Sequence, residues 1–322
     1  MVLRRNPILQ VRVRNIVEET SAIKRFTLQA FDYSQLPSFS GGSHITTFLP
    51  HSSGTLERHY SIFNLNAEAS MFEIAVRLAK DSTGGSRYWH QNVKIGDVLP
   101  ISYPKNYFPL SFQAKHNVFY AAGIGITPFL SMMAELAEKN SSFELHYAAK
   151  SKDQCAFYGF LSKTYPDQCH FYFSNGEGNK RLLPTQLLNH RIGTHVYFCG
   201  PENMIQDFTN AAKSYGYPSF NIHVERFAPP AKKEQNAFQA ILKRSKKQLE
   251  VPENASLLEV LLQNGIKVPY SCRAGGCGTC EIKVVEGQIV HFDSFLTEDQ
   301  QCSKQSMLSC VSRGNGRLVL DL

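Results

Sequence analysis

Four cysteines near the carboxyl end of the chain have types and spacing that suit redox chemistry. Cys272, Cys277 and Cys280 form the pattern C-x4-C-x2-C, and Cys310 follows thirty residues later. This is the spacing of a plant-type [2Fe-2S] site, in which a tight loop supplies three thiolates and a remote strand supplies the fourth. The pattern therefore predicts a metal site that moves single electrons.

The residues between these cysteines fit the same interpretation. Gly275, Gly276 and Gly278 lie inside the loop. Because glycine adopts backbone angles that other residues avoid, such a loop can turn its amide N–H groups toward sulfur. These donors favour the added negative charge of a reduced cluster. We expect the loop to bind a cluster through all four thiolates.

A structural zinc site and a disulfide framework are the two alternatives. Zinc ribbons usually present two C-x2-C pairs, and only Cys277 and Cys280 form one here. Disulfide frameworks belong to secreted chains, and the charged start, residues 1–8, has no apolar signal segment after it. The remaining cysteines follow no motif: Cys155, Cys169, Cys199 and Cys302.

Size and charge narrow the class of protein. A chain of 322 residues is long enough for two or three domains, each with its own core. The net charge is +7, but the basic residues are dispersed and no nucleic-acid-binding motif accompanies them. The most apolar stretch, 117–133, contains glycine and proline, as a buried strand, turn and helix start would. We expect a cytoplasmic protein with an acidic protein partner, and neither a nucleic acid nor a membrane partner.

The pattern of apolar residues predicts two different sheets ahead of the cysteines. Short alternating runs in the first hundred residues indicate an antiparallel β-barrel or sandwich. Beyond residue 113, buried runs alternate with helical stretches, as in an open α/β parallel sheet. The alternating runs are 9–17, 24–30, 44–49 and 71–78, the buried runs are 117–122, 143–148, 168–174 and 194–199, and the helices are 129–139 and 202–214.

A polar, proline-bearing segment at 227–236 indicates a linker. After it, Ser256 and Glu259 have the spacing of a capping box, which opens a short helix that ends at Gly265. The chain is therefore predicted to be multidomain, with a barrel, an α/β domain and a cysteine domain. Their expected bounds are 1–110, 111–226 and 237–322, with the linker at 227–236.

The barrel contains a strand with a cation, an aromatic ring and a hydroxyl group close together. Alternation places Arg58, Tyr60 and Ile62 on one face, and His59 and Ser61 on the other. Arg58 suits a phosphate and Tyr60 suits packing on a flavin. An ordinary sheet with an exposed arginine beside a half-buried tyrosine explains the same residues.

A glycine-rich turn follows at Gly84, Gly85 and Ser86, beside Arg87, and leads toward a helix. Free amides, a hydroxyl and a cation at such a turn form a plausible nest for a phosphate. A simple tight turn is the alternative.

Two strand ends in the α/β domain could approach a dinucleotide. After the first, Gly123 and Gly125 allow close approach of a pyrophosphate, with Thr127 as N-cap and Pro128 at N1 of a helix. The spacing differs from G-x-G-x-x-G. After the second, Cys199 sits at the carboxyl edge of the sheet, where ligands bind. Gly200 and Pro201 follow it, with Pro201 at N1 of the next helix. A small buried hydrophobe is the other interpretation of Cys199.

Taken together, these motifs resemble the phthalate dioxygenase reductase family, the NADH-dependent iron–sulfur flavoprotein reductases that serve Rieske-type oxygenases. The resemblance covers nearly the whole chain in the family's domain order. It rests on these residues: Arg58, Tyr60, Ser61, Gly84, Gly85, Ser86, Gly123, Gly125, Thr127, Pro128, Cys199, Gly200, Pro201, Cys272, Cys277, Cys280 and Cys310.

The resemblance implies an FMN-binding barrel, an NAD(P)-binding α/β domain and a β-grasp-like plant-type ferredoxin domain. It implies that hydride passes from NADH to FMN and that electrons leave singly through the cluster to a Rieske-type mono- or dioxygenase. Ser61 would lie near the flavin's reactive nitrogen, Thr127 and Cys199 would flank the nicotinamide, and Phe227 would lie against the flavin.

Several alternatives stay open at this stage. NADPH is possible, because Lys150, Ser151 and Lys152 follow a strand where a 2′-phosphate could bind. The chain could also be a stand-alone diaphorase, a donor to another acceptor, or a non-catalytic electron carrier. Arg273 and the basic run 243–247 suit docking to an acidic partner, and a solvated loop charge and an ordinary hairpin turn explain them equally well.

Overall fold

The structure is a computed structural model that describes residues 8–32, 35–51, 54–64, 70–80, 82, 84–175, 180–228 and 236–322. The start of the chain at 1–7, most of the predicted linker at 229–235, and Asp81 and Thr83 beside the glycine-rich turn lie outside these residues. The chain forms two compact units, residues 1–225 and 226–322.

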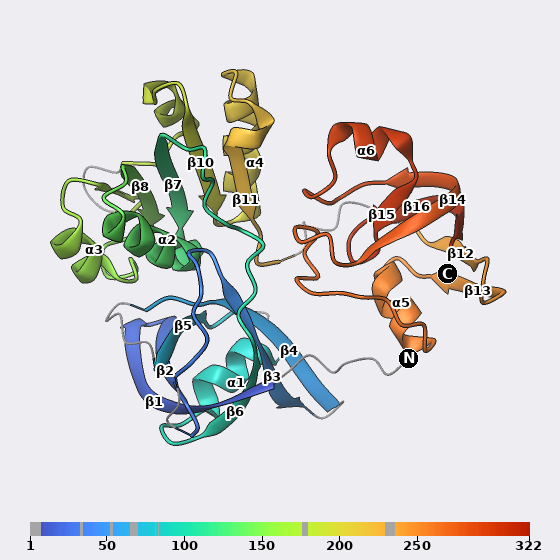
Figure 1. The fold of residues 1–322 in the computed structure, drawn as a ribbon, viewed down its shortest axis with the longest axis horizontal. Helices are drawn as coiled ribbons and strands as arrows, with labels where there is room; N and C mark the ends of the chain where they lie inside the picture. Colours follow the sequence, from blue (N-terminus) through green and yellow to red (C-terminus); the bar gives the residue numbers. More distant parts are fainter. Residues whose placement is uncertain are drawn as a thin grey trace. The chain divides into compact units, whose positions relative to one another are not determined.

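The first unit begins with the expected antiparallel barrel (Figure 1). Six strands pair antiparallel in the order β4-β3-β6-β1-β2-β5. Backbone hydrogen bonds between Phe63 and Glu73, at 2.9 and 3.0 Å, join the two ends of this sheet. The elements are β1 (Ile8–Thr20), β2 (Ile23–Ala30), β3 (His44–His51), β4 (Gly54–Ser61), β5 (Met71–Arg77), α1 (Gly85–Gln91) and β6 (Val98–Ser102).

Alternation along the strands builds the barrel's core. Val11 and Val13 of β1 are fully buried, whereas Arg12 between them is only partly buried. Trp89 of α1 is also fully buried, and its ring meets the ring of Phe26 edge-on, with centroids 4.7 Å apart. The helix therefore contributes an aromatic ring to the core of the barrel.

The second part of this unit is the expected parallel sheet, with strand order β11-β10-β7-β8-β9. Two predicted elements, 194–199 and 202–214, have the predicted bounds. The elements are β7 (His116–Ala122), η1 (Gly123–Ile126), α2 (Thr127–Glu138), β8 (Phe143–Ala149), α3 (Tyr158–Thr164), β9 (Cys169–Phe173), η2 (Pro184–Asn189), β10 (Thr194–Cys199), α4 (Glu202–Ser214), η3 (Ser219–Asn221) and β11 (Ile222–Glu225).

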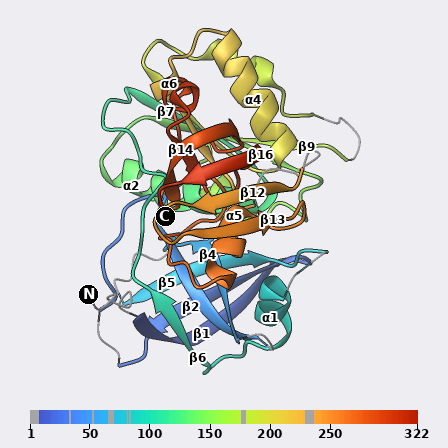
Figure 2. The same cartoon turned by 90° about the vertical axis from the view of Figure 1, so that its right-hand side faces the viewer.

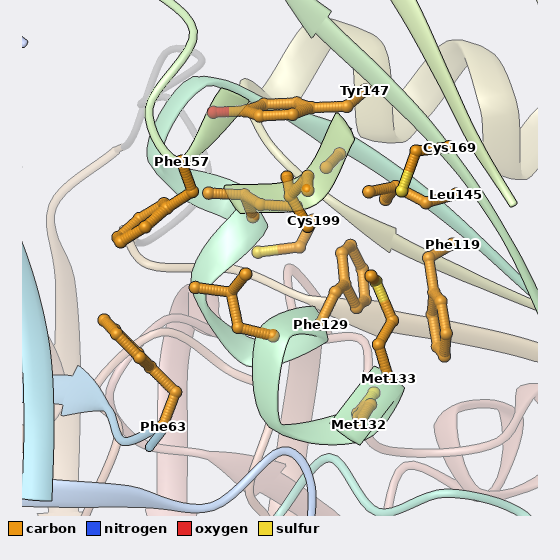
Figure 3. Packing of buried hydrophobic residues seen from close by; sticks show 14 of the residues in the cluster. Phe63, Phe119, Phe129, Met132, Met133, Leu145, Tyr147, Phe157, Cys169 and Cys199 are labelled. Carbon is orange, nitrogen blue, oxygen red and sulfur yellow. The ribbon is translucent and has the colours of Figure 1, made fainter. Parts of the chain in front are cut away.

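Each face of the parallel sheet has its own hydrophobic cluster. Phe119 on β7 packs with Phe129 and Met133 of α2 on one face (Figure 3). Tyr120, the next residue, packs with Phe208 of α4 on the other face. Strands that are buried on both sides read as continuous apolar runs, which explains their clear signal in the sequence.

The barrel and the parallel sheet share contacts within the first unit. Phe63, just after β4, belongs to the cluster under α2, and its ring centroid lies 5.4 Å from that of Phe157 (Figure 3). The amide of Gly41 donates to Glu135 at 2.7 Å, and the amide of Gly42 donates to Ser131 at 3.2 Å. These contacts join the end of β4 and the segment before β3 to the part of the first unit that contains the parallel sheet. The two glycine-bearing strand ends belong to that sheet.

The second unit is a mixed sheet of order β13-β12-β16-β14-β15 with a helix packed on it (Figure 2). β12 pairs antiparallel with β13 and parallel with β16, as expected of a β-grasp-like domain. The predicted capping box is confirmed, because Ser256 Oγ accepts from the Glu259 amide at 3.2 Å. The elements are β12 (Phe238–Leu242), β13 (Lys247–Val251), α5 (Leu257–Gln263), β14 (Glu281–Val290), α6 (Glu298–Ser303), β15 (Ser306–Leu308) and β16 (Arg313–Leu320).

Among the described residues, no helix is both long enough and apolar enough to span a membrane.

Candidate functional site

The four predicted cluster cysteines come together in the second unit. Cys272, Cys277 and Cys280 lie on the loop between α5 and β14. Cys310 lies in the turn after β15, and not on a strand as we expected. The neighbouring Ser309 ties this turn to the loop, because its amide and its hydroxyl both donate to the Cys280 carbonyl, at 3.1 and 3.0 Å.

Two of the three loop glycines are required by their surroundings. Gly275 has φ +76°, and a Cβ there would lie 2.7 Å from Val311 Cγ2. Gly278 has φ +73°, and a Cβ there would lie 2.3 Å from the ring of Phe295. Gly276 differs from our expectation, because its φ is not positive and its nearest neighbour would be 4.0 Å away. Its role is its amide, which hydrogen-bonds Cys272.

Backbone amides point at the sulfur atoms, as predicted. The Ala274 amide donates to Cys272 Sγ at 3.4 Å, and the Gly275 amide donates to Cys310. Amides directed at thiolates stabilise the negative charge that a cluster and its ligands carry.

The thiols form two hydrogen-bonded pairs, Cys272 with Cys277 and Cys280 with Cys310. The hydrogen bond from Cys272 lowers the pKa of Cys277 to about 5, and the hydrogen bond from Cys310 lowers the pKa of Cys280. In the described ranges, no group of three or more His, Cys, Asp or Glu side chains is arranged around a single metal ion. Four thiols arranged as two neighbouring pairs suit a [2Fe-2S] cluster, which takes four cysteine thiolates.

The flavin strand has the predicted faces. A Cβ at Gly85 would lie 2.6 Å from Arg58 Cγ, so the Arg58 side chain lies against the start of α1. Tyr60 faces the same way, with its ring centroid 5.9 Å from that of Trp89. On the opposite face, His59 Nδ1 and Thr46 Oγ1 lie 3.0 Å apart.

Ser61 ends the strand with a buried hydroxyl. The residue is 5% exposed, and its Oγ has no hydrogen-bond partner in the part of the chain that the structure describes. A buried polar atom without a partner is costly, so it suits contact with a bound ligand.

The glycine-rich turn opens a helix, as expected. Gly84 has φ +109°, and α1 starts at Gly85. Ser86 Oγ donates to Ser82 Oγ at 2.9 Å, and the amides of Gly84 and Arg87 donate to the same Ser82 oxygen at 3.3 Å. Ser82 therefore accepts from the amides of Gly84 and Arg87 in this structure, and the sequence interpretation overlooked it.

The two glycine-bearing strand ends meet in the first unit. β7 and β10 are parallel neighbours, with Ala121 opposite Cys199. A Cβ at Gly125 would lie 2.2 Å from the Cys199 carbonyl oxygen and 2.9 Å from the Gly200 amide nitrogen. Only glycine permits this approach, so the predicted nicotinamide elements form one surface.

Two predicted helix starts shift by one residue. Thr127 is not the N-cap, because the backbone is already helical from Gly123 through a 3-10 turn, and Thr127 is the first residue of α2. Its hydroxyl donates to the Ile124 carbonyl at 3.1 Å. Pro201 is the N-cap of α4 and not N1. Both residues remain at the carboxyl edge of the sheet.

Cys199 satisfies both interpretations given to it. It ends β10 at the carboxyl edge, and it is also 1% exposed within the hydrophobic cluster (Figure 3). Burial raises the pKa of its thiol well above the usual range. Cys199 is therefore a neutral thiol in this structure.

Glu225 is a site residue that our sequence interpretation missed. It lies opposite Cys199 in the register of β10 and β11, and burial raises the pKa of its carboxyl to about 8. Its Oε2 has no hydrogen-bond partner among the described residues. In the sequence Glu225 is a carboxyl group at the end of a short strand, and nothing local shows that it lies beside Cys199.

Two further predictions fall at the edges of this site. Phe227 belongs to the second unit and is 49% exposed, so its contact with a flavin stays a prediction. Lys152 follows β8, and its Nζ lies 4.7 Å from the ring centroid of Tyr158. Lys152 and Tyr158 line a cleft of about 780 Å³ in the first unit that also includes Arg25.

Arg273 and Arg244, two of the basic residues predicted to suit docking, have local partners. Arg273 has φ +54°, and its guanidinium lies 4.4 Å from the ring centroid of Tyr270. Residues 243–246 of the basic run form the turn between β12 and β13, and Lys247 begins β13. In this turn Arg244 makes two hydrogen bonds to Asp321, at 2.8 and 2.6 Å. The hairpin interpretation of this run is confirmed.

Comparisons with known proteins agree with this arrangement. A family model described as "2Fe-2S iron-sulfur cluster binding domain" matches residues 240–313, and one described as "Dimethylamine monooxygenase subunit DmmA-like, N-terminal domain" matches 102–222. The chain is 40% identical to the carnitine monooxygenase reductase subunit of Escherichia coli, over 98% of both chains.

Two other matches also span nearly the whole chain. It is 40% identical to the heme-dependent oxidative N-demethylase beta subunit of Ectopseudomonas mendocina, over 98% of this chain and 99% of the relative. The solved structure of phthalate dioxygenase reductase, "a modular structure for electron transfer from pyridine nucleotides to [2Fe-2S]", superposes with a TM-score of 0.75. It is 30% identical, over 98% of both chains.

Proposed function

Because the chain belongs to the phthalate dioxygenase reductase family, we propose that it is the NADH-dependent reductase component of an oxygenase system. It would take hydride from NADH onto FMN and pass single electrons through a [2Fe-2S] cluster to a Rieske-type mono- or dioxygenase. The observation that carries this proposal is the pairing of Cys272 with Cys277 and of Cys280 with Cys310 under loop amides.

The two prosthetic groups would supply the conversion of a two-electron hydride into single electrons, and the chain would supply placement. Cys272 and Cys277 would hold one iron, and Cys280 and Cys310 the other. Arg58, with Gly84, Gly85 and Ser86, would hold the flavin phosphate, and His59 and Tyr60 would line the flavin.

At the carboxyl edge of the parallel sheet, Gly123 and Gly125 would admit the dinucleotide beside Gly200 and Pro201. Thr127 and Cys199 would flank the nicotinamide, with Phe227 on the flavin from the chain segment that follows. Cys199 is buried and Glu225 is half-buried, and because the pKa of each is raised, neither presents a charge to the nicotinamide ring at neutral pH.

Anaerobic addition of NADH to the purified full-length protein tests this proposal. We expect the flavin colour to bleach and a rhombic EPR signal to develop from the reduced cluster. Protein with one zinc per chain, and without iron and acid-labile sulfide, would contradict it.

Ser61 provides a test of the flavin site itself. The S61A variant should slow the reduction of flavin by NADH about 5- to 10-fold, because a buried hydrogen bond to the ligand is lost. The S61T variant keeps the hydroxyl and should retain most of the rate. Stopped-flow absorbance measures both, and equal rates for S61A and the parent protein would remove Ser61 from the site.

A second partner class has its own support. One relative is named as a subunit of a heme-dependent N-demethylase, so a heme-containing oxygenase is the alternative acceptor. Purified candidate oxygenases of both kinds, each supplied with this reductase and NADH, would separate the two. Substrate-dependent turnover by the heme protein alone would replace the Rieske assignment.

Three further points complete the proposal. NADH is preferred over NADPH, although Lys150 and Lys152 could meet a 2′-phosphate, and comparison of the Michaelis constants for NADH and NADPH decides this.

The functional domains are residues 1–110, 111–226 and 237–322, joined by a linker at 227–236. The protein would work in the cytoplasm, where NADH is supplied.

A further inference from the structure

A cavity of about 500 Å³ lies in the first unit, at the edge of the parallel sheet where β10 and β11 begin. The glycines and Cys199 of the proposed nicotinamide site lie at the opposite edge, where the strands end. β10 runs from Thr194 to Cys199, and at about 3.3 Å per residue its two ends are roughly 17 Å apart. The cavity is therefore separate from the proposed redox site.

The walls of this cavity are mainly apolar. Leu187 is 1% exposed and forms part of the floor, where the Tyr217 hydroxyl donates to the Leu187 carbonyl at 2.6 Å. Leu188, Ile192 and Phe220 are exposed around the opening. Polar side chains also line it, among them His190, Arg191 and His195. Cavities of this size that combine apolar walls with polar groups are typical of small-molecule sites.

Two buried side chains in the lining each have one polar atom without a hydrogen-bond partner in the part of the chain that the structure describes. Thr194 is 1% exposed and Asn221 is 6% exposed. The Asn221 side-chain nitrogen donates to the Thr194 carbonyl at 3.0 Å, which fixes the orientation of the amide. Within the described residues, Thr194 Oγ1 and Asn221 Oδ1 have no hydrogen-bond partner. Such groups are rare in folded proteins because each one costs free energy.

Thr194 Oγ1 and Asn221 Oδ1 together suit one kind of ligand group. Asn221 Oδ1 can only accept a hydrogen bond, and the Thr194 hydroxyl can donate one. A single hydroxyl group on a ligand satisfies both, because it donates to Asn221 and accepts from Thr194. The apolar walls then require the rest of the ligand to be apolar, and the aromatic side chains of Tyr217 and Phe220 favour a flat ring.

The two histidines that line the cavity, His190 and His195, are neutral, because burial lowers the pKa of each. His195 Nδ1 lies 2.9 Å from His223 Nε2, and the two rings stack. Burial lowers the pKa of both histidines, that of His223 to about 4. The charged side chain of the lining, Arg191, is exposed, so a charged ligand head held at the buried Asn221 would meet no buried counter-charge.

Water alone is a poor occupant of this cavity. A volume of about 500 Å³ corresponds to roughly fifteen water molecules. One or two of them could hydrogen-bond Thr194 and Asn221, but the others would face apolar walls. Their displacement by an apolar ring is favourable.

We propose that this cavity binds a small, neutral aromatic molecule that carries a hydroxyl group, with the hydroxyl held between Thr194 and Asn221. The site does not depend on the proposed redox function. It adds a ligand site to the edge of the nucleotide domain that lies opposite the dinucleotide elements.

Equilibrium dialysis of 2-naphthol against the full-length holoprotein tests the proposal. We expect saturable binding of one molecule per chain. The methyl ether, 2-methoxynaphthalene, keeps the ring but cannot donate a hydrogen bond, and it should bind about 5-fold more weakly or worse. Equal affinity of the two compounds, or no saturable binding, would overturn the proposal without any need for a variant.

Two threonine-to-valine variants test whether 2-naphthol binds in this cavity. T194V removes the hydroxyl and keeps the shape, so 2-naphthol should bind about 5-fold more weakly. T209V is the matched control, because Thr209 Oγ1 is also buried without a partner among the described residues but lies on α4 and outside the cavity lining. Equal effects of T194V and T209V, or displacement of the probe by NAD⁺, would place the probe elsewhere and overturn the proposal.

Discussion

Cys310 is the residue that separates the two proposed redox centres most cleanly. It pairs with Cys280 in the second unit and is remote in sequence from every proposed flavin contact. The C310S variant should lose reduction of cytochrome c, which needs the cluster, and keep reduction of ferricyanide, which the flavin performs directly. Steady-state assays with NADH measure both activities.

The control for this variant is C302S. Cys302 is exposed on α6 and pairs with no other cysteine thiol in the described residues, so both activities should be unchanged. Loss of both activities in C310S, with normal flavin content, would contradict the order in which we place the two centres.

Glu225 gives the first unit a predictable dependence of stability on pH. Burial raises the pKa of its carboxyl from 4.5 to about 8, so between these values the folded state holds a proton that the unfolded state releases. The free energy of unfolding should therefore fall as pH rises through this window, by up to about 1.4 kcal/mol per pH unit. The E225Q variant should show a flatter profile.

Urea unfolding of the parent protein and the variant across this window checks the sign. E138Q is the matched control, because Glu138 is exposed at the end of α2. If the profiles of E225Q and the parent protein run parallel from pH 5 to pH 8, roughly the window that the pKa shift defines, Glu225 is not the group responsible.

Single residues also mark the limit of what the sequence could predict. The metal ligands were predictable because cysteine spacing is a local pattern that reflects cluster geometry. Glu225 and Ser82 were not, because their importance depends on neighbours distant in the chain or on which amides a turn exposes. Glu225 becomes notable only when β11 pairs with β10 and buries its carboxyl beside Cys199.

At the scale of elements, Gly125 sets how closely the η1 turn approaches the end of β10. Alanine there would place a methyl carbon 2.2 Å from the Cys199 carbonyl oxygen, so backbone must move. The free energy of unfolding of the G125A variant should be about 1–3 kcal/mol lower than that of the parent protein. NADH should also reduce the flavin of this variant more slowly. Thermal unfolding and stopped-flow measurements check the two effects.

Gly159 is the control for this substitution. It lies in α3 without a positive φ, and a Cβ there would meet nothing within 4 Å. The free energy of unfolding of the G159A variant should be about 0.5–1 kcal/mol higher than that of the parent protein, as expected when alanine replaces glycine in a helix. If the free energy of unfolding of G125A falls by no more than that of G159A changes, the close approach of Gly125 to the Cys199 carbonyl is not required for stability.

Elements with strong periodicity were predictable, and those that depend on tertiary contacts were not. β10 and α4 have the predicted bounds because one is a continuous apolar run and the other has a regular helical pattern. β6 was missed because Val98–Ser102 is short and contains a proline, and it becomes a strand only by pairing with β1. The shift at Thr127 has a similar cause, because the glycines before it already follow a helical turn.

At the scale of the whole molecule, the two compact units divide the proposed chemistry. The first unit holds the flavin strand and the dinucleotide elements in one contact network, whereas the second holds all four cluster ligands. Hydride transfer therefore belongs to one unit and the exit of single electrons to the other.

The net charge of +7 then predicts how salt should affect the two stages. Docking to an acidic oxygenase would be steered by charges at long range, and salt shortens that range from about 8 Å at 0.15 M to about 3 Å at 1 M. Reduction of the partner should therefore slow several-fold as salt rises, whereas NADH-to-ferricyanide turnover, which needs no protein docking, should change little. Both rates can be followed in the same buffer series. Equal sensitivity of the two rates would show that the positive charge does not guide the partner, because salt would then be acting on a step inside the first unit.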